Sequence, residues 1–346
     1  MPSPSPALLP PVRRVVLVAP GRSGSTLLQS AFLASCERTL TFFEPCRHAP
    51  DKEGGEAVFK QACVAQVLRF LSCELPQTPA GQWSPTRLRA WLRHPYVAAN
   101  ASCAAPPFAS VRQTISTCQQ APVVVVKEIR LVGQLSLLAD ALEARASKTR
   151  EQYAIVHLVR DPLPMLASQR RLQWWGMVAP TGNNDNNRSA STSSSQQRKQ
   201  QRKKMERVAK RTCRGMVADA KVGSRLQRQG GKYVRYTRVR FEDLTSRLNE
   251  TVAWLYRDLG IAMLPSTHEW VERTLQGRCA NGGLGDGGRN ATMNFEYGTC
   301  RHSSSPRRDW RNELPELERQ VISRQCKRAM ATFGYAGLQP SENGRS

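Results

Sequence analysis

The chain lacks the features that mark several common classes of protein. It has no C-x-x-C pair and no cluster of cysteine and histidine with the spacing of a zinc site. No apolar run reaches the 18 residues of a membrane span, and the first residues hold no signal-peptide core. Internal repeats are absent as well. We therefore expect a metal-independent globular protein rather than a zinc protein or a repeat array, with membrane contact only through an anchor outside this sequence.

Acidic residues are scarce relative to basic ones. The 346 residues include 27 Asp and Glu against 51 Lys and Arg, a net charge of +24. Residues 188–214 alone hold ten of the basic residues and a single Glu, but the remainder is strongly basic too. Such a surplus predicts polyanionic partners, of which nucleic acid, acidic glycans and anionic membranes all qualify. The length and the 40% of hydrophobic residues fit one large domain, with or without insertions.

The compartment is left open by two opposing signals. Ten cysteines and four N-x-S/T sequons, at Asn100, Asn187, Asn249 and Asn290, favour a secretory lumen. The Pro- and Ser-rich start without a signal peptide or an anchor favours the cytosol.

Short apolar runs alternate with helical patterns along the chain. Runs typical of buried strands span 15–19, 123–126 and 154–159, and an alternating run spans 233–240. Helical patterns are expected at 27–36, 62–71, 131–146, 163–172, 248–259 and 317–333. This order predicts an α/β fold with a P-loop-like, doubly wound and mainly parallel sheet flanked by helices.

The strongest local motif is a glycine-rich turn directly after the first predicted strand. Residues 21–28 read G-R-S-G-S-T-L-L and lead into a helix, so free backbone N–H groups and the positive helix end converge on an anion. Ser25 stands where the P-loop of nucleoside triphosphatases has lysine, which favours a ligand without β- and γ-phosphates. The expected binding residues are Gly21, Arg22, Ser23, Gly24, Ser25, Thr26 and Leu27.

A second anion site is expected at the end of another strand. Arg160 follows the run 154–159, and Ser168 lies eight residues later, about two turns into the next helix. A guanidinium and a hydroxyl together suit a second phosphate. A salt bridge between Arg160 and Asp161 is the structural alternative.

Two further charged residues stand at strand ends, where ligands of open α/β sheets bind. Glu44 ends a short apolar run in F-F-E-P and is a candidate general base. Lys127 ends the run 123–126 and is a candidate for neutralising charge on a leaving oxygen. A solvated acid and a solvated lysine are the alternatives. His48 and His157 compete with Glu44 for the role of base.

Taken in order, these motifs resemble the sulfotransferase superfamily. Residues 21–28 resemble its 5′-phosphosulfate loop, and residues 157–172 resemble its 3′-phosphate site. The detail is most similar to Golgi carbohydrate sulfotransferases that act on the 6-hydroxyl of N-acetylglucosamine, galactose or N-acetylgalactosamine. Their turn reads R-S-G-S-[ST] and is followed by F-E-P, which correspond here to 22–26 and 43–45.

The resemblance continues into the C-terminal half and spans about residues 14–336. V-R-F-E-D-L at 239–244 is similar to the family's R-Y-E-D-L, and Trp310, Cys326 and Gly334-Tyr335 are similar to its W…C…G-Y ending. The basic insertion 182–212, the absent anchor, Pro164 and Gln169 depart from the family's pattern. Low complexity predicts that 182–212 is disordered, and 1–13 and 337–346 are expected to be flexible.

The resemblance implies the chemistry. The co-substrate would be 3′-phosphoadenosine 5′-phosphosulfate (PAPS), released as 3′-phosphoadenosine 5′-phosphate (PAP), with no metal. Arg160 and Ser168 would hold the 3′-phosphate, while Arg22, Thr26 and Lys127 would stabilise charge and Glu44 would take the acceptor proton. The acceptor would be an acidic glycan or proteoglycan, without a specific nucleic-acid partner, in the Golgi lumen.

Three alternatives stay open at this stage. A protein-tyrosine sulfotransferase would use the same loop and a similar glutamate. A P-loop kinase is disfavoured by the missing lysine, and a non-enzymatic polyanion binder would not need two ordered phosphate anchors. Cys300 and Cys326 are candidate disulfide partners, although sequence leaves the pairing open.

Overall fold

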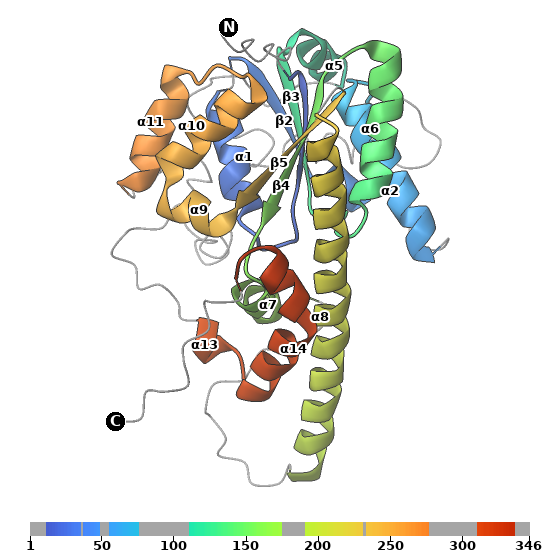
Figure 1. Cartoon of the computed structure of the whole chain (residues 1–346), viewed down its shortest axis with the longest axis vertical. Coiled ribbons are helices and arrows are strands. Elements are labelled where there is room, and N and C mark those ends of the chain that lie inside the picture. The colour runs from blue at the N-terminus through green and yellow to red at the C-terminus, as the bar shows by residue number, and fades with distance from the viewer. Residues whose placement is uncertain are drawn as a thin grey trace, which may run out of the picture.

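The computed structural model describes residues 12–35, 37–48, 55–75, 111–174, 191–230, 233–276 and 310–335. A five-stranded sheet in the order β2-β3-β1-β4-β5 forms its centre, and every strand pairing is parallel (Figure 1). The strands are β1 (Arg14–Val18), β2 (Thr39–Phe43), β3 (Val123–Glu128), β4 (Tyr153–Val159) and β5 (Val234–Arg240). The predicted parallel α/β sheet is thus confirmed.

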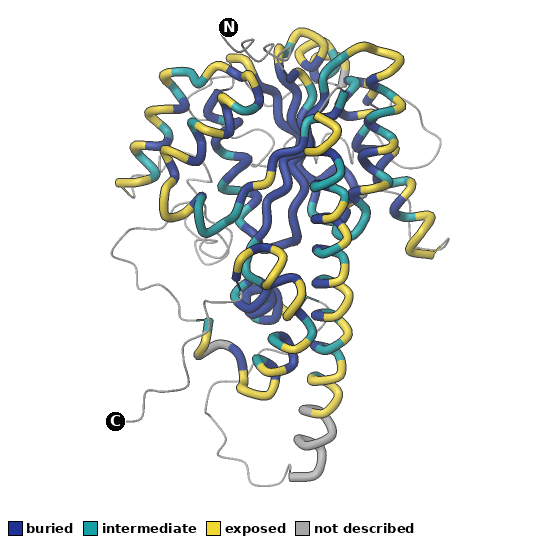
Figure 2. The backbone as a smooth tube through the Cα atoms, viewed as in Figure 1, coloured by how far each residue is buried: buried dark blue, intermediate teal, exposed yellow. Residues whose placement is uncertain are grey.

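Helices cover both faces of the sheet, which is why β3 and β4 are buried along their whole length (Figure 2). On one face pack α1 (Ser25–Ala34), α10 (Leu248–Leu259) and α11 (Pro265–Leu275). On the other face pack α2 (Gly55–Leu71), α5 (Val111–Gln120) and α6 (Leu135–Thr149). The parallel arrangement brings the carboxyl ends of all five strands to one edge.

A third apolar cluster lies beyond that edge. It joins α7 (Pro162–Arg171), α8 (Ser191–Arg228) and α14 (Glu316–Thr332). The short elements η1 (Pro45–His48), α9 (Phe241–Ser246) and α13 (Trp310–Glu313) complete the described part of the chain. Helix α7 begins as predicted, with Pro162 at its first turn and the Asp161 carboxylate capping the N–H of Leu163 at 3.0 Å.

The prediction of disorder for 182–212 is wrong for residues 191–212, which form the first half of α8. The composition of this tract is polar, but an apolar stripe begins within it and continues along the helix. Its members, buried at helical spacing, are Met205, Ala209, Cys213, Met216 and Ala220. Gln, Arg and Lys are also good helix formers. Residues 182–190 lie outside the described part.

The described structure begins at Val12 and so includes the last two residues of the predicted flexible segment 1–13. Val12 is buried, and its N–H donates to the Leu259 carbonyl at 3.2 Å, while the Arg13 N–H donates to the Gln152 carbonyl at 3.2 Å. The prediction of flexibility is therefore wrong for Val12 and Arg13. Residues 1–11 and 337–346 lie outside the described residues.

Three disulfides tie the described elements together: Cys46–Cys63, Cys73–Cys118 and Cys213–Cys326. The third joins α8 to α14 across 113 residues of sequence, so it removes much conformational freedom from the unfolded chain. The candidate pairing of Cys326 with Cys300 is therefore wrong. None of the helices within these described ranges is long and apolar enough to cross a bilayer.

Candidate active site

The glycine-rich turn connects β1 to α1 at the centre of the sheet edge. Arg22 and Gly24 both have positive φ, 69° and 85°, and Gly24 is the N-cap of α1 without a side-chain cap. The first N–H groups of an α-helix have no acceptor within the helix, so those of Ser25 to Leu27 can donate to a bound anion. The turn therefore has an uncapped helix N-terminus at the expected position, and anion binding there stays a prediction.

Two aromatic rings hold the backbone of the turn in this shape. A Cβ atom added at Gly24 would lie 2.3 Å from the Phe241 ring, and one added at Gly21 would lie 2.2 Å from the Trp174 ring. Both positions therefore require glycine. Phe241 belongs to the V-R-F-E-D-L segment at 239–244, so this distant segment packs against the turn.

The two predicted anion sites are in direct contact. The Arg160 guanidinium donates to the Arg22 carbonyl at 2.8 Å, and the Arg22 Nε donates to the Ser168 Oγ at 3.0 Å. The Arg160 guanidinium also lies 4.2 Å from the centre of the Phe241 ring. Two cations and a hydroxyl thus gather beside the turn. With Arg22 directed to Ser168, its role at the transferring group stays a prediction.

Gln169 is a residue of this site that sequence reasoning did not assign. Its side-chain amide donates to the Gly21 carbonyl at 2.8 Å and is buried. The only feature of the sequence that pointed to Gln169 was its departure from the family's pattern. Ser23 behaves differently from the prediction, because its Oγ points to the Met165 sulfur at 3.4 Å and its N–H donates to the Pro20 carbonyl. The Ser23 side chain therefore serves packing in this structure.

Glu44 and Lys127 meet at the ends of β2 and β3. The Lys127 Nζ lies 2.9 Å from the Glu44 Oε1 and 3.3 Å from the Thr26 Oγ1, and it lies 3.8 Å from the centre of the Phe43 ring. Lys127 is 1% exposed and Glu44 is 7% exposed. The solvated alternatives for both residues are thus wrong. An ammonium group from β3 now stands beside the turn that lacks the P-loop lysine.

Arg130 completes a charge cluster that the sequence did not reveal. Its guanidinium lies 2.9 Å from the Glu44 Oε2 and 3.2 Å from the Glu128 Oε1. Burial alone would raise the pKa of Glu44, but Lys127 and Arg130 together lower it below its ordinary value. Glu44 is therefore ionised at neutral pH, as a proton acceptor must be.

Glu128 fixes the surroundings of this cluster. Its Oε1 accepts from the backbone N–H groups of Ile129 and Arg130 at 2.9 and 3.0 Å, and its Oε2 accepts from that of Cys46 at 2.9 Å. The side chain is fully buried. Glu128 thus joins the end of β3 to η1, the segment that follows Glu44, and it orients Arg130.

The sulfur atoms of Cys46 and Cys63 lie close to Glu128, a grouping of metal-ligating residue types. Both cysteines are bonded to each other, so neither offers a thiolate to a metal. The bond instead ties η1 to α2 next to Glu44.

The C-terminal motifs converge on the second anion site. The Glu242 Oε1 accepts from the Asp161 N–H at 3.1 Å, and the Tyr335 hydroxyl donates to the Glu242 Oε2 at 2.8 Å. The Arg240 guanidinium lies 4.6 Å from the centre of the Tyr335 ring. The segments 239–244 and 334–335 therefore brace the turn from Arg160 into α7.

His157 is not a candidate base. It is buried, its Nδ1 lies 2.9 Å from the Tyr236 hydroxyl, and burial together with Arg238 lowers its pKa to about 3. The side chain of His48 lies outside the described residues.

Replacing Glu128 by Gln tests its role in holding the cluster. The amide would place an NH₂ group against the Cys46 N–H, two donors facing each other, so we expect a loss of about 1–3 kcal/mol in the free energy of unfolding. Denaturant unfolding measures this loss, and Glu272→Gln, an exposed change on α11, is the matched control. Equal stability of the two variants would contradict the assigned role.

No family model matches the chain. Human carbohydrate sulfotransferase 3 is 24% identical over 95% of this chain and 68% of its own length. Human carbohydrate sulfotransferase 6 is 26% identical over 70% of this chain and 55% of its own length. The chain thus spans between about half and two thirds of the length of these relatives.

Among solved structures, the sulfotransferase domain of the Synechococcus PCC 7002 olefin synthase is similar with a TM-score of 0.45, at 16% identity over 95% of this chain and 97% of that one. Mouse sulfotransferase SULT7A1 complexed with PAP gives a TM-score of 0.45, at 11% identity over 94% and 89%. The sequence relatives confirm the resemblance that the motifs predicted: the chain is similar to carbohydrate sulfotransferases 3 and 6.

Proposed function

We propose that the chain transfers a sulfuryl group from PAPS to a hydroxyl of a carbohydrate by in-line displacement at sulfur. The observation that carries this function is the contact of Lys127 with both Glu44 and Thr26, which joins an ionised carboxylate to the anion-binding turn. The names of the sequence relatives support sulfuryl transfer and a carbohydrate acceptor.

The residues of the turn fit the two charged ends of this donor. The helix N-terminus at Ser25 to Leu27 would bind the 5′-phosphosulfate, which supplies the sulfuryl group and a phosphate leaving group. Arg160 and Ser168 would bind the 3′-phosphate, with Arg22 between the two sites. Recognition of the 3′-phosphate would select this donor over ordinary adenine nucleotides.

Glu44 would act as the general base. The acceptor oxygen forms a bond to sulfur, its proton passes to the Glu44 carboxylate, and the sulfur–oxygen bond to the leaving phosphate breaks with the electron pair on the phosphate. An anion bound at the turn competes for the Lys127 ammonium, which lies 3.3 Å from Thr26. Donor binding would thereby weaken the hold of Lys127 on Glu44 and raise the basicity of the carboxylate.

The proposed function also suggests the cellular compartment in which the protein works. Three disulfides among the described residues favour an oxidising lumen, and Asn249 of one sequon is exposed at the start of α10. A Golgi lumen would supply such conditions. The surplus of basic charge favours an acidic glycan or proteoglycan as acceptor.

Isothermal titration with PAP tests the donor assignment. We expect micromolar binding of PAP, weak binding of ADP, and a loss of about tenfold or more in PAP affinity for Arg160→Ala, because a charge-assisted contact to the 3′-phosphate is removed. Arg257→Ala, an exposed change on α10, is the control and should bind as the wild type. Equal affinity for PAP and ADP would overturn the assignment and favour a P-loop nucleotide enzyme.

The pH dependence of transfer tests the charge cluster. Arg130 lowers the pKa of Glu44, so Arg130→Gln should raise that pKa. Because the base must be ionised, the acidic limb of the kcat profile should move to higher pH, with the loss of activity largest on the acidic side. Arg47→Gln, an exposed change on η1, should leave the profile in place. If the acidic limb does not move in Arg130→Gln, the titration behind that limb belongs to a group other than Glu44.

A further inference from the structure

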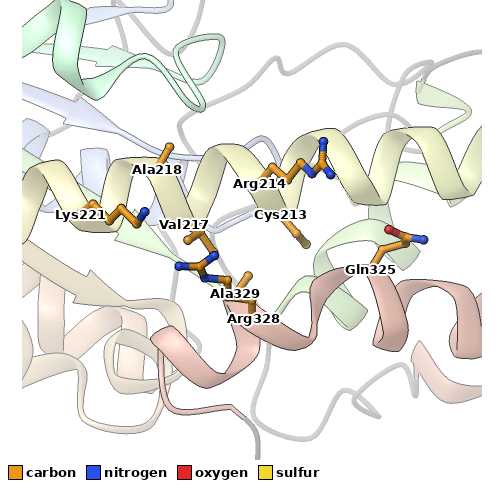
Figure 3. A pocket seen from close by; sticks show the side chains of 8 residues that line it. All are labelled: Cys213, Arg214, Val217, Ala218, Lys221, Gln325, Arg328 and Ala329. Atoms are coloured by element: carbon orange, nitrogen blue, oxygen red, sulfur yellow. The ribbon is translucent and has the colours of Figure 1, made fainter.

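A hollow of about 250 Å³ lies between α8 and α14, and the proposed reaction does not use it (Figure 3). Its lining includes the apolar side chains of Val217, Ala218 and Ala329, and it also includes Cys213, which is bonded to Cys326. Its rim is cationic. The charged residues around it are Arg214 and Lys221 from α8 and Arg328 from α14.

The three rim cations are exposed, and no carboxylate of the described residues lies within ion-pair distance of them. The two acidic side chains of α8 between 199 and 228 are engaged elsewhere. Glu206 bonds Arg324 and Gln325 on α14, and the buried Asp219 accepts from the backbone of Gly133 and Leu135. The positive charge at the hollow is therefore uncompensated within the described structure.

The same side of α8 continues this charge along the helix. Lys203, Arg207, Lys210, Arg214 and Lys221 recur at intervals of four, three, four and seven residues, which places them on one helix face. All five are exposed, so a row of cations about 27 Å long, at 1.5 Å per residue, leads into the hollow. We call this row and the hollow the basic groove.

The platform under the basic groove is rigid. The opposite stripe of α8, including Met205, Ala209 and Met216, is buried in the cluster shared with α7 and α14. The Cys213–Cys326 bond fixes the two helices at the hollow itself. Rigid helices keep the spacing of these cations constant, which favours a polymer with regularly repeated anions.

We propose that the basic groove binds a linear acidic polysaccharide, whose carboxylates or sulfates pair with its cations. This inference rests on the proposed function, because the polymer would be a carbohydrate acceptor held outside the reaction centre. None of the eight lining residues is aromatic, so the hollow offers no stacking platform for nucleic-acid bases. Binding at the groove would raise the local concentration of the polymer's sugars at the active site.

The test compares two triple variants of the full chain with equal loss of charge. The groove variant is Arg214→Ala, Lys221→Ala and Arg328→Ala. The control variant is Arg69→Ala, Lys148→Ala and Arg257→Ala, which are exposed residues of α2, α6 and α10. Thermal unfolding first establishes that both variants fold like the wild type.

Binding to chondroitin sulfate is measured at several salt concentrations, with neutral dextran as the reference polymer. We expect the groove variant to bind about tenfold more weakly and with a shallower salt dependence, and the control variant to bind nearly as the wild type. If both variants lose affinity for the polysaccharide equally, binding depends only on net charge, and the proposal is overturned. Single-stranded or duplex DNA that displaces the polysaccharide at equal charge concentration would also overturn it.

Sulfate transfer separates failure of this inference from failure of the proposed function. The groove variant should raise the KM for a polymeric acceptor by about the same tenfold and leave transfer to a disaccharide acceptor unchanged. Unchanged KM for the polymer would overturn the groove's role. Absence of transfer to every acceptor by the wild type, with polysaccharide binding intact, would contradict the proposed function and leave the binding site in place.

Discussion

The ion pair between Glu44 and Lys127 is the contact on which the candidate site depends. Both side chains are almost entirely buried, so each charge would be strongly destabilising without the other. The pair ties the end of β2 to the end of β3, and Lys127 extends the link to Thr26 at the start of α1. One contact therefore holds the strand ends together and places an ionised carboxylate beside the anion-binding turn.

Arg130 and Glu128 explain how this pair is tolerated at the sheet edge. The Arg130 guanidinium donates to the second Glu44 oxygen and to Glu128. Glu128 also accepts hydrogen bonds from three backbone N–H groups, those of Cys46, Ile129 and Arg130. The Cys46–Cys63 bond keeps η1 against α2 directly after Glu44. A buried network whose polar groups are all satisfied is rigid, which suits groups that must stay in position during transfer.

Periodicity and strand ends were enough to predict the parallel sheet and the placing of Glu44, Lys127 and Arg160 at one edge. They did not reveal Arg130 or Gln169, because a hydrogen bond to a distant carboxylate or carbonyl leaves no local pattern. The order in 191–212 was missed for a related reason. Its buried stripe is visible only at helical spacing, and the helix is stabilised by packing on α14 rather than by its own composition.

The C-terminal motifs acquire a physical meaning in the structure. Phe241 packs on Gly24 and under Arg160, and Glu242 joins the backbone of Asp161 to Tyr335. Segments that are distant in sequence thus shape the same turn. A change in either segment would act on donor binding through geometry, without contact to the reacting atoms.

The role of the Glu44–Lys127 pair is tested most directly by the kinetics of Glu44→Gln. Glutamine keeps the shape of the side chain and an acceptor for Lys127, but it cannot take a proton at neutral pH. We expect a fall in kcat of about 10²–10⁴-fold, with the Kd for PAP nearly unchanged. A variant that retains most of its kcat would contradict the assignment of Glu44 as the base and the catalytic role of the Glu44–Lys127 pair.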